Sequence, residues 1–174
     1  GPYDNNGSST RQLRFIFHRM THSTPIPVKS RNKVQLNLLY VDDLVNGFVR
    51  CMENSVSHGK IYNIAGDDLT SEQEIIELSG KVCKIKPNIH WVNNHVYDDI
   101  KLGGPWREYD WIMDNAKIKK ELALEFTTLE IALRKTHTWF RNTPHYSKLT
   151  SIRGEQYLLE NRTIPKIVRV YWKC

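Results

Sequence analysis

The sequence predicts an α/β (α+β) domain in which helices pack against a small mixed sheet. Short β-branched runs alternate with segments whose apolar residues recur every three or four positions, as on one helix face. The chain has 174 residues, 40% hydrophobic and 25% charged, a composition typical of a globular domain with one core. No apolar run approaches the roughly 20 residues that a membrane-spanning helix needs, so we expect no membrane association.

The first predicted helix covers residues 11–22. Its apolar residues share one face: Leu13, Ile16, Phe17 and Met20. Residues 23–27 contain two prolines and end the helix, because proline lacks an amide donor and restricts the residue before it. Residues 34–40 then favour a strand.

The clearest helical pattern follows at residues 41–52. We expect one face of this helix to be buried, formed by Val41, Leu44, Val45, Phe48, Val49 and Met52. Asp42 and Asp43 stand at its start, where carboxylates cap free amides and oppose the helix dipole.

Gly59 then interrupts the regular structure, and residues 61–64 predict a short strand followed by a turn at 66–68. Thr70 or Ser71 is predicted to cap the next helix, with Gln73 and Glu74 in capping-box positions. This helix extends to about Val82, and its buried face holds Ile75, Ile76 and Leu78.

The C-terminal half predicts a strand at 86–92, a loop from 95 to 109 and two further helices. Asp114 caps the first, which ends near Leu122. Thr127 or Thr128 caps the second, whose buried face comprises Leu129, Ala132, Leu133, Thr136 and Phe140.

Regular patterning fades after Pro144 and returns as strand character at 164–171. We therefore divide the chain into a domain at 1–143, a linker at 144–163, and an extra strand or the start of a further domain at 164–174.

The net charge of +6 is concentrated in the tail, because residues 134–174 hold nine of the 25 Lys and Arg and two of the 19 acidic residues. A basic tail can contact phosphate or nucleic acid. Without a recognisable nucleic-acid-binding fold, we expect a solvated extension and no nucleic-acid partner. The three scattered cysteines predict reduced thiols in a cytoplasmic protein.

His18 and His22 have a spacing compatible with metal binding. Neither a neighbouring glutamate base nor a third ligand accompanies them, so we interpret them as partly exposed histidines and predict no metal site. The acidic pairs at 42–43 and 67–68 are interpreted as caps and turns.

Several short motifs follow one another in order over residues 1–141. They are Gly1-Pro2, Leu39-Tyr40-Val41-Asp42-Asp43-Leu44, Gly59-Lys60-Ile61-Tyr62-Asn63-Ile64-Ala65-Gly66, Leu69-Thr70-Ser71-Glu72-Gln73-Glu74-Ile75, Asp114-Asn115-Ala116-Lys117-Ile118-Lys119-Lys120-Glu121-Leu122, and Thr128-Leu129-Glu130 leading to Thr138-Trp139-Phe140. This series resembles the C-terminal, substrate-binding portion of extended short-chain dehydrogenases/reductases, the NAD-dependent epimerase/dehydratase family.

The resemblance implies a substrate-binding lobe from which most of the Rossmann core is absent. It implies part of an NAD(P)-dependent nucleotide-sugar epimerase, dehydratase or reductase, inactive without its cofactor domain. NAD or NADP would belong to the intact parent enzyme and not to this chain alone, because the Gly-rich phosphate-binding turn is missing. The partners implied are a nucleotide sugar and the missing Rossmann domain or parent chain, with a homodimer left open.

Tyr97 and Lys101 have the spacing of the family's Tyr-x-x-x-Lys base pair, but they lie between two motifs of the substrate-binding portion. A motif counts only in its structural context. We therefore predict no catalytic residue in this chain.

Substrate contact is the role that the resemblance leaves to this chain. Arg107 and Asp110 match the family's Arg-x-x-Asp contact, and a guanidinium binds phosphate oxygens in pairs. The alternative is a surface arginine paired with Glu108 or Asp110.

A second family arginine corresponds to Leu36 here, which departs from the usual pyrophosphate site. Lys33 or Gln35 could substitute for it, and Asn63 could approach the ligand or form a turn. The predicted substrate-binding residues are therefore Arg107, Asp110, Gln35, Lys33 and Asn63.

A non-catalytic binding or scaffold module that kept the fold is the alternative function. Residues 164–173 are similar to the opening strand of some glycosyltransferases, although Arg169 replaces their histidine. This alternative therefore includes fusion to a glycosyltransferase.

Overall fold

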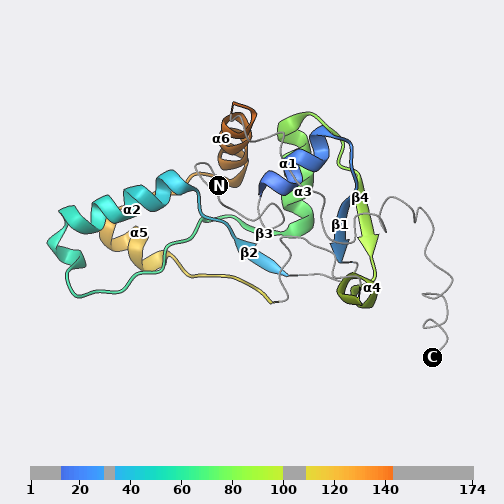
Figure 1. Ribbon diagram of the computed structural model, residues 1–174. Helices are drawn as coiled ribbons and strands as arrows, with labels where there is room; N and C mark the ends of the chain where they lie inside the picture. The colour runs from blue at the N-terminus through green and yellow to red at the C-terminus, as the bar shows by residue number, and fades with distance from the viewer. Residues whose placement is uncertain (1–12, 30–33, 100–108, 143–174) are drawn as a thin grey trace.

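The computed structural model describes residues 13–29, 34–99 and 109–142 (Figure 1). Its elements are, in chain order, α1 (Leu13–Thr21), β1 (Ile26–Lys29), β2 (Gln35–Asn37), α2 (Val41–Glu53), the 3-10 helix η1 (Ser55–Ser57), β3 (Leu69–Ser71), α3 (Glu72–Cys83), β4 (Ile89–Val92), α4 (Asn94–Asp99), α5 (Ala116–Leu122) and α6 (Leu129–Arg141). The expected mixture of helices and short strands is confirmed.

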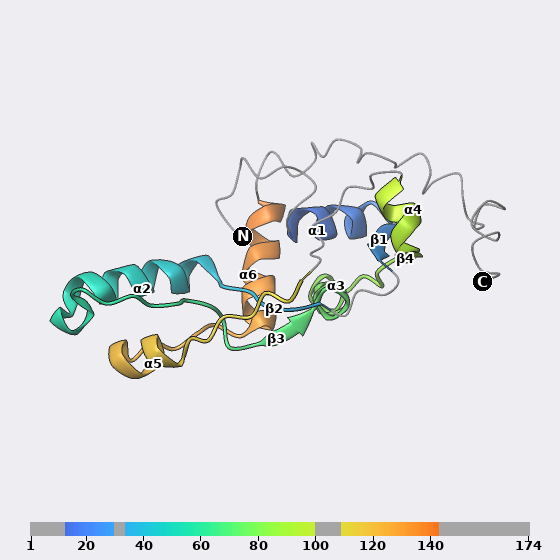
Figure 2. The same cartoon turned by 90° about the horizontal axis from the view of Figure 1, so that it is seen from below.

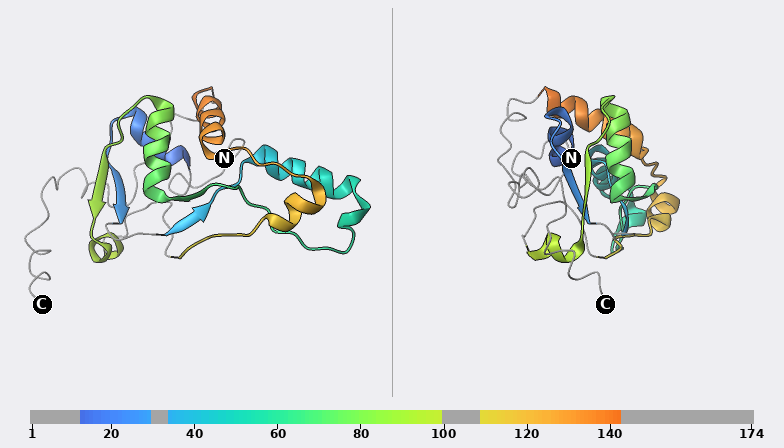
Figure 3. Two further views of the ribbon diagram at one scale, coloured as in Figure 1. Left: turned by 180° about the vertical axis from the view of Figure 1, so that it is seen from behind. Right: turned by 90° about the vertical axis from the view of Figure 1, so that its right-hand side faces the viewer.

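The described part of the chain is elongated, and two parts can be distinguished in Figures 1 and 2. The body contains α1, β1, α3, β4, α4 and α6. The arm contains α2, η1, α5 and the extended segment 60–67 that runs beside them. The strands β2 and β3 lie between the two parts, and Figure 3 shows the same division from behind.

The strands form two small sheets and not one. In the body, β1 and β4 pair in parallel from Ile26 opposite Ile89 to Lys29 opposite Val92. Between body and arm, β2 and β3 pair antiparallel, and Leu36 also forms a parallel bridge with Trp111. The sequence did not predict β1, because Pro27 lies inside it. Proline is tolerated here because β1 pairs on one side only within the described residues.

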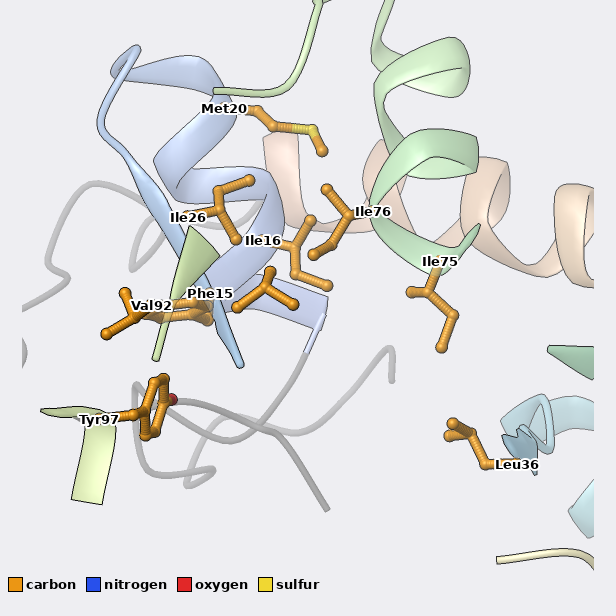
Figure 4. Close-up of a cluster of buried hydrophobic side chains, with 10 residues drawn as sticks. Phe15, Ile16, Met20, Ile26, Leu36, Ile75, Ile76, Val92 and Tyr97 are labelled. Atoms are coloured by element: carbon orange, nitrogen blue, oxygen red, sulfur yellow. The ribbon is translucent and has the colours of Figure 1, made fainter. Parts of the chain in front are cut away.

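The core of the body joins α1, β1, α3 and β4. Figure 4 shows Ile16, Ile26 and Ile76 pointing toward one another, and each is at most 2% exposed. A second cluster joins α1 to α6 through Phe17, Leu133 and Phe140. Burying one such side chain contributes about 1.5–3 kcal/mol. The predicted apolar faces of α1, α3 and α6 are thus confirmed.

Helix capping matches the sequence predictions only in part. The Ser71 capping box forms, with Ser71 N donating to the Glu74 carboxylate at 2.7 Å and Glu74 N donating to Ser71 Oγ at 3.3 Å. The Asp114 carboxylate accepts from Ala116 N at 2.8 Å. Thr128 is the N-cap of α6, but it makes no side-chain cap bond, and Asp68 instead accepts from Leu129 N.

Asp43 was predicted to cap α2, and this is wrong. Its carboxylate accepts from the backbone N and Oγ1 of Thr127, at 2.9 and 2.8 Å. The N-cap position belongs to Tyr40, without a side-chain bond. Asp43 therefore connects α2 in the arm to the turn that leads into α6.

The predicted buried face of α2 is also wrong. Val45, Phe48 and Met52 are 55%, 62% and 74% exposed, and only Asp43 and Gly47 of α2 are buried. Residues 61–64, predicted as a strand, are extended but pair with no strand of the described chain.

Other predictions meet different outcomes. The predicted loop from residue 95 begins instead with the short helix α4. Gly1-Pro2, residues 144–163 and the predicted strand at 164–171 lie outside the described residues. No helix of the described ranges is long and apolar enough to cross a membrane.

Candidate functional site

Two of the predicted substrate-binding residues are brought together where β2 meets the segment 110–113. Gln35 N donates to the Asp110 carboxylate at 2.8 Å, although 75 positions separate the two residues. Trp111 N donates to Gln35 O at 2.7 Å, and Asn37 N donates to Trp111 O at 3.3 Å. Segment 110–113 is therefore held beside β2 like a short additional strand.

At the other end of β2, the Asn37 side chain makes further hydrogen bonds that hold this junction together. Its Nδ2 donates to Met113 O at 2.9 Å and to Gly66 O at 3.2 Å, while its Oδ1 accepts from Met113 N at 3.1 Å. Sequence reasoning missed Asn37. The available signal was an amide side chain inside a predicted strand, where polar residues on the core side usually satisfy backbone groups.

Glycine is required at position 66 because the backbone of Leu38 passes very close to its Cα. A Cβ at this position would lie 2.2 Å from the backbone oxygen of Leu38, well inside contact distance. The glycine that ends the family-like motif at 59–66 therefore allows the 60–67 segment to pass directly against the chain after β2.

Leu36 occupies the position of the family's second arginine, and it is a core residue. Its side chain is 7% exposed and belongs to the main cluster of the body. The side chains of Gln35 and Asn37 on either side are less buried, as strand alternation requires. This position contributes to packing, so any phosphate contact must come from neighbouring residues.

The outer edge of the junction is aromatic. Tyr109 and Trp111 flank Asp110, and these residues are 79% and 48% exposed. An exposed aromatic ring beside hydrogen-bonding groups can stack on a flat heterocycle such as a nucleotide base. The junction therefore has the chemistry of a binding surface.

Asn63 lies away from this junction, on the extended segment of the arm. Its side chain is exposed and makes no hydrogen bond with a described residue. Lys33 and Arg107 lie outside the described residues, as does Lys101. Tyr97 is part of the body core.

Polar contacts attach α5 to the extended segment of the arm. Tyr62 Oη donates to the Glu121 carboxylate at 2.7 Å, which raises the pKa of Tyr62 to about 12. Lys60, 2.8 Å from the same carboxylate, lowers the pKa of Glu121. Lys119, 2.7 Å from Asp67, likewise lowers the pKa of that carboxyl. These exposed pairs hold the arm together and leave no free carboxylate pair for acid–base chemistry within this cluster.

The motif at 114–122 has a structural explanation. The N-cap of α5 is Asn115 and not the predicted Asp114, whose carboxylate accepts from Ala116 N in the first turn. Leu122 is buried, and Lys117 Nζ donates to Ile61 O at 2.9 Å while lying 4.8 Å from the centre of the Tyr62 ring. The motif therefore fixes α5 against the 60–67 segment.

The helix starts that follow strands do not suit the pyrophosphate of a dinucleotide. Such a site needs free backbone amides and no competing negative charge. The first turn of α2 carries Asp42 and Asp43, and that of α3 carries Glu72 and Glu74. The pKa of Glu74 is lowered by its bonds from Ser71, so its carboxylate stays charged. These two helix starts therefore do not offer a pyrophosphate site of this kind.

His18 of α1 and His22, just after the end of that helix, are stacked. The rings of His18 and His22 are 4.0 Å apart, and His22 Nδ1 lies 2.9 Å from His18 O. In residues 13–29, 34–99 and 109–142, no group of three potential ligands is placed to hold a metal ion.

The described fold is an α/β arrangement of helices and two small sheets. The sequence model of the NAD dependent epimerase/dehydratase family matches residues 1–65. An Arabidopsis thaliana trifunctional UDP-glucose 4,6-dehydratase/UDP-4-keto-6-deoxy-D-glucose 3,5-epimerase/UDP-4-keto-L-rhamnose-reductase is 27% identical over 139 residues, 76% of this chain and 19% of that protein.

Solved structures show the same fold. The dTDP-glucose 4,6-dehydratase of Bacillus anthracis, in complex with NAD, matches with a TM-score of 0.62 and 16% identity, over 78% of this chain and 40% of that one. The UDP-glucuronic acid 4-epimerase of Bacillus cereus, in complex with UDP-glucuronic acid and NAD, matches with a TM-score of 0.57 and 18% identity, over 71% and 37%.

These findings confirm the resemblance found in the sequence: the chain is similar to the NAD-dependent epimerase/dehydratase family over residues 1–65, and its described part shares the fold of solved epimerases and dehydratases. It spans 19% of the length of the curated relative and about two fifths of the solved structures.

Proposed function

We propose that this chain is the substrate-binding portion of an NAD(P)-dependent nucleotide-sugar epimerase, dehydratase or reductase. In this proposal NAD or NADP is held by the cofactor domain of the intact enzyme, and the chain alone does not catalyse the reaction. The names of its relatives support this substrate class, since they act on UDP- and dTDP-sugars. We also infer a cytoplasmic location from the free thiols of Cys51 and Cys83.

The hydrogen bond from Gln35 to Asp110 is the observation that carries the proposal. It fixes two chain segments side by side. In the sequence, each segment is preceded within a few residues by a basic residue that is predicted to bind phosphate. Lys33 precedes Gln35 by two positions and Arg107 precedes Asp110 by three. The proposal assigns Arg107 and Lys33 to the diphosphate and Trp111 to the base.

In this proposal Asp110 acts as a positioning residue. Its carboxylate is engaged with the backbone of β2, so it orients the chain that carries Arg107. Asn63 is proposed as a separate contact on the arm, toward the part of a ligand that lies beyond the junction.

A non-catalytic module is the second candidate function, and Leu36 favours it. A buried leucine replaces a cation at a position where the family places one, which removes one phosphate contact. The basic tail and the glycosyltransferase-like residues 164–173 stay predictions for the fused form of this candidate.

Isothermal titration calorimetry with UDP and dTDP tests the proposal. The wild-type chain should bind saturably, and Arg107→Ala should weaken binding roughly tenfold to a hundredfold, because a charge-assisted phosphate contact is lost. Arg134→Ala is the matched control, since Arg134 is an exposed arginine on α6 paired with Glu130 at 2.9 Å.

Asp110→Asn adds a second test. The amide keeps the size but weakens the acceptor for Gln35 N, so nucleotide affinity should fall while thermal stability changes little. Absence of nucleotide binding by the wild-type chain, with a cooperative melt showing that it is folded, would favour the non-catalytic module.

A further inference from the structure

Asn37 is a side chain of the junction whose hydrogen-bonding groups are all engaged with backbone. Its Nδ2 donates to Met113 O at 2.9 Å and to Gly66 O at 3.2 Å, and its Oδ1 accepts from Met113 N at 3.1 Å. An amide side chain has two N–H donors and one carbonyl acceptor, so both donors and the acceptor have partners. Asn37 therefore connects three chain segments: β2, residues 60–67 and residues 110–113.

Backbone pairing alone holds the segment beside β2 only weakly. Leu36 and Trp111 form an isolated bridge, and both backbone bonds around it involve Trp111, whose N donates to Gln35 O and whose O accepts from Asn37 N. The register of so short a pairing is weakly specified, and a slip by one residue turns each side chain to the opposite face. Asp110 would then lose its bond with the backbone N of Gln35.

The Asn37 side chain supplies the missing specification. Because it binds both the N–H and the C=O of Met113, it continues the pairing beyond Trp111 and fits one alignment of the two segments. Its third partner is the carbonyl of Gly66, a residue packed so closely that a Cβ there would lie 2.2 Å from the backbone oxygen of Leu38. That carbonyl therefore gives Asn37 a fixed point on the arm.

We propose that Asn37 is a positioning residue of the nucleotide-binding edge. It selects the register in which Asp110 binds β2 and Trp111 lies at the exposed edge, and it acts through that segment without touching the ligand. The identity of the ligand rests on the proposed function, whereas the register can be measured without any ligand.

Asn37→Asp tests the role on the 174-residue chain. The variant keeps the shape of the side chain but removes both donors, and it places a carboxylate oxygen opposite the carbonyls of Met113 and Gly66. The segment should shift or loosen, so the affinity for UDP measured by calorimetry at pH 7.5 should fall roughly tenfold.

A pH series gives a readout that a loss of folding stability alone would not produce. Protonation of the introduced carboxyl restores one donor, and burial against two carbonyl oxygens makes it protonate above the ordinary carboxyl range of about pH 4. The ratio of wild-type to variant affinity should therefore shrink from roughly tenfold at pH 7.5 to below about threefold at pH 5. Taking the ratio at each pH cancels the titration of UDP itself.

The position of Trp111 gives a readout without ligand. In protein labelled with ¹⁵N-tryptophan, the indole resonance that disappears in Trp111→Phe reports this residue. It should shift or broaden in Asn37→Asp at pH 7.5 and return toward its wild-type position at pH 5. The backbone amide of Trp111 should exchange at least about tenfold faster in the variant at pH 7.5. The amide of Ile26, which donates to Asn88 O at 2.8 Å in the body, should keep its protection.

Asn115→Asp is the matched control. Asn115 Nδ2 donates to Ala65 O at 2.9 Å and to the Asp67 carboxylate at 2.8 Å, so it is also an amide bound to the 60–67 segment. This variant should lower the melting temperature but leave the Trp111 resonance and the affinity for UDP unchanged. Asn37→Ala removes the same bonds without adding a charge, and it should lower the affinity equally at both pH values.

Two results would overturn the proposal. In one, folded Asn37→Asp keeps both the wild-type Trp111 resonance and the wild-type affinity for UDP. In the other, its affinity ratio is the same at pH 5 and pH 7.5, which would exclude the lost donors as the cause. If the wild-type chain does not bind UDP, the proposed function fails, and the Trp111 resonance still decides whether Asn37 sets the register.

Discussion

The body and the arm differ in whether their apolar helix faces are buried. In the body, α1, α3 and α6 bury the faces that their periodicity predicts. In the arm, α2 has the clearest periodicity in the sequence, yet its predicted face is exposed. Apolar periodicity therefore predicts which side of a helix is apolar. It does not show that this side is buried within the described chain.

Replacing one phenylalanine in each part should give the largest difference in the free energy of unfolding. Phe17 is fully buried against Phe140 and His137, whereas Phe48 is 62% exposed. Phe17→Ala should lower the free energy of unfolding by about 3–5 kcal/mol, and Phe48→Ala should change it by less than about 0.5 kcal/mol. Urea denaturation of the 174-residue chain followed by circular dichroism measures both.

Equal losses in the two variants would mean that Phe48 is covered within the chain itself. The contrast between body and arm would then disappear.

Local signals explain why most of the helices could be predicted. The Ser71 capping box depends on residues within a few positions and forms as expected. The Asp114 carboxylate accepts from Ala116 N, also a local contact, although the N-cap of α5 is Asn115 and not Asp114. The prediction for Asp43 failed because its partner, Thr127, is 84 positions away. A carboxylate at a helix start has the same sequence pattern whether it caps its own helix or binds a distant turn.

Replacing Gly66 and Gly47, at the boundary between β2 and the arm, should give the next largest difference in stability. A Cβ at Gly66 would lie 2.2 Å from the backbone oxygen of Leu38, while a Cβ at Gly47 would lie 2.4 Å from the end of the Ile64 side chain. Gly66→Ala should therefore cost about 1–3 kcal/mol of unfolding free energy, because backbone must move.

Gly47→Ala should cost less, since Ile64 can change rotamer and alanine favours the helix by up to about 1 kcal/mol. Thermal melts of the two variants, made side by side, measure the difference. A larger loss for Gly47→Ala would show that Ile64 is held rigidly and that the arm is packed as tightly as the body.

The joint between arm and α6 tests whether the two parts unfold together. Asp43→Asn weakens a charged acceptor that binds both the backbone N and the hydroxyl of Thr127, which should cost about 1–3 kcal/mol. Asp42→Asn is the control, since Asp42 is exposed in the same turn. A double-mutant cycle with Thr127→Val should show coupling, and additive losses would contradict the contact.

The candidate site was less predictable than the fold. The Arg-x-x-Asp motif selected Asp110, but the carboxylate binds the backbone of Gln35, a role that sequence spacing cannot reveal. Asn37 escaped notice because its three bonds reach Gly66 and Met113, 29 and 76 positions away. Leu36 shows why the family pattern alone misleads, because its side chain belongs to the core.

The smallest expected effect is a pH dependence of stability. As the pH falls, it should involve a histidine of the body before it involves a carboxylate of the arm. Burial lowers the pKa of His137 below 6.5, and the nearby Arg141 lowers it further. The folded state therefore prefers the neutral imidazole, which packs beside Phe17 with ring centres 5.1 Å apart. Its contribution to stability is complete above pH 6.5 and decreases as the pH falls through the lowered pKa.

Carboxylates respond at lower pH. The pKa values of Asp67 in the arm and Glu130 in the body are also lowered, by Lys119 and Lys81 respectively. Their contributions are complete above the ordinary carboxyl range, about pH 4, and are lost only below it. Melting temperatures measured from pH 7.5 to 5.5 should therefore decline slightly for the wild type, and His137→Phe should flatten that slope. An unchanged slope in His137→Phe would show that His137 does not cause the pH dependence.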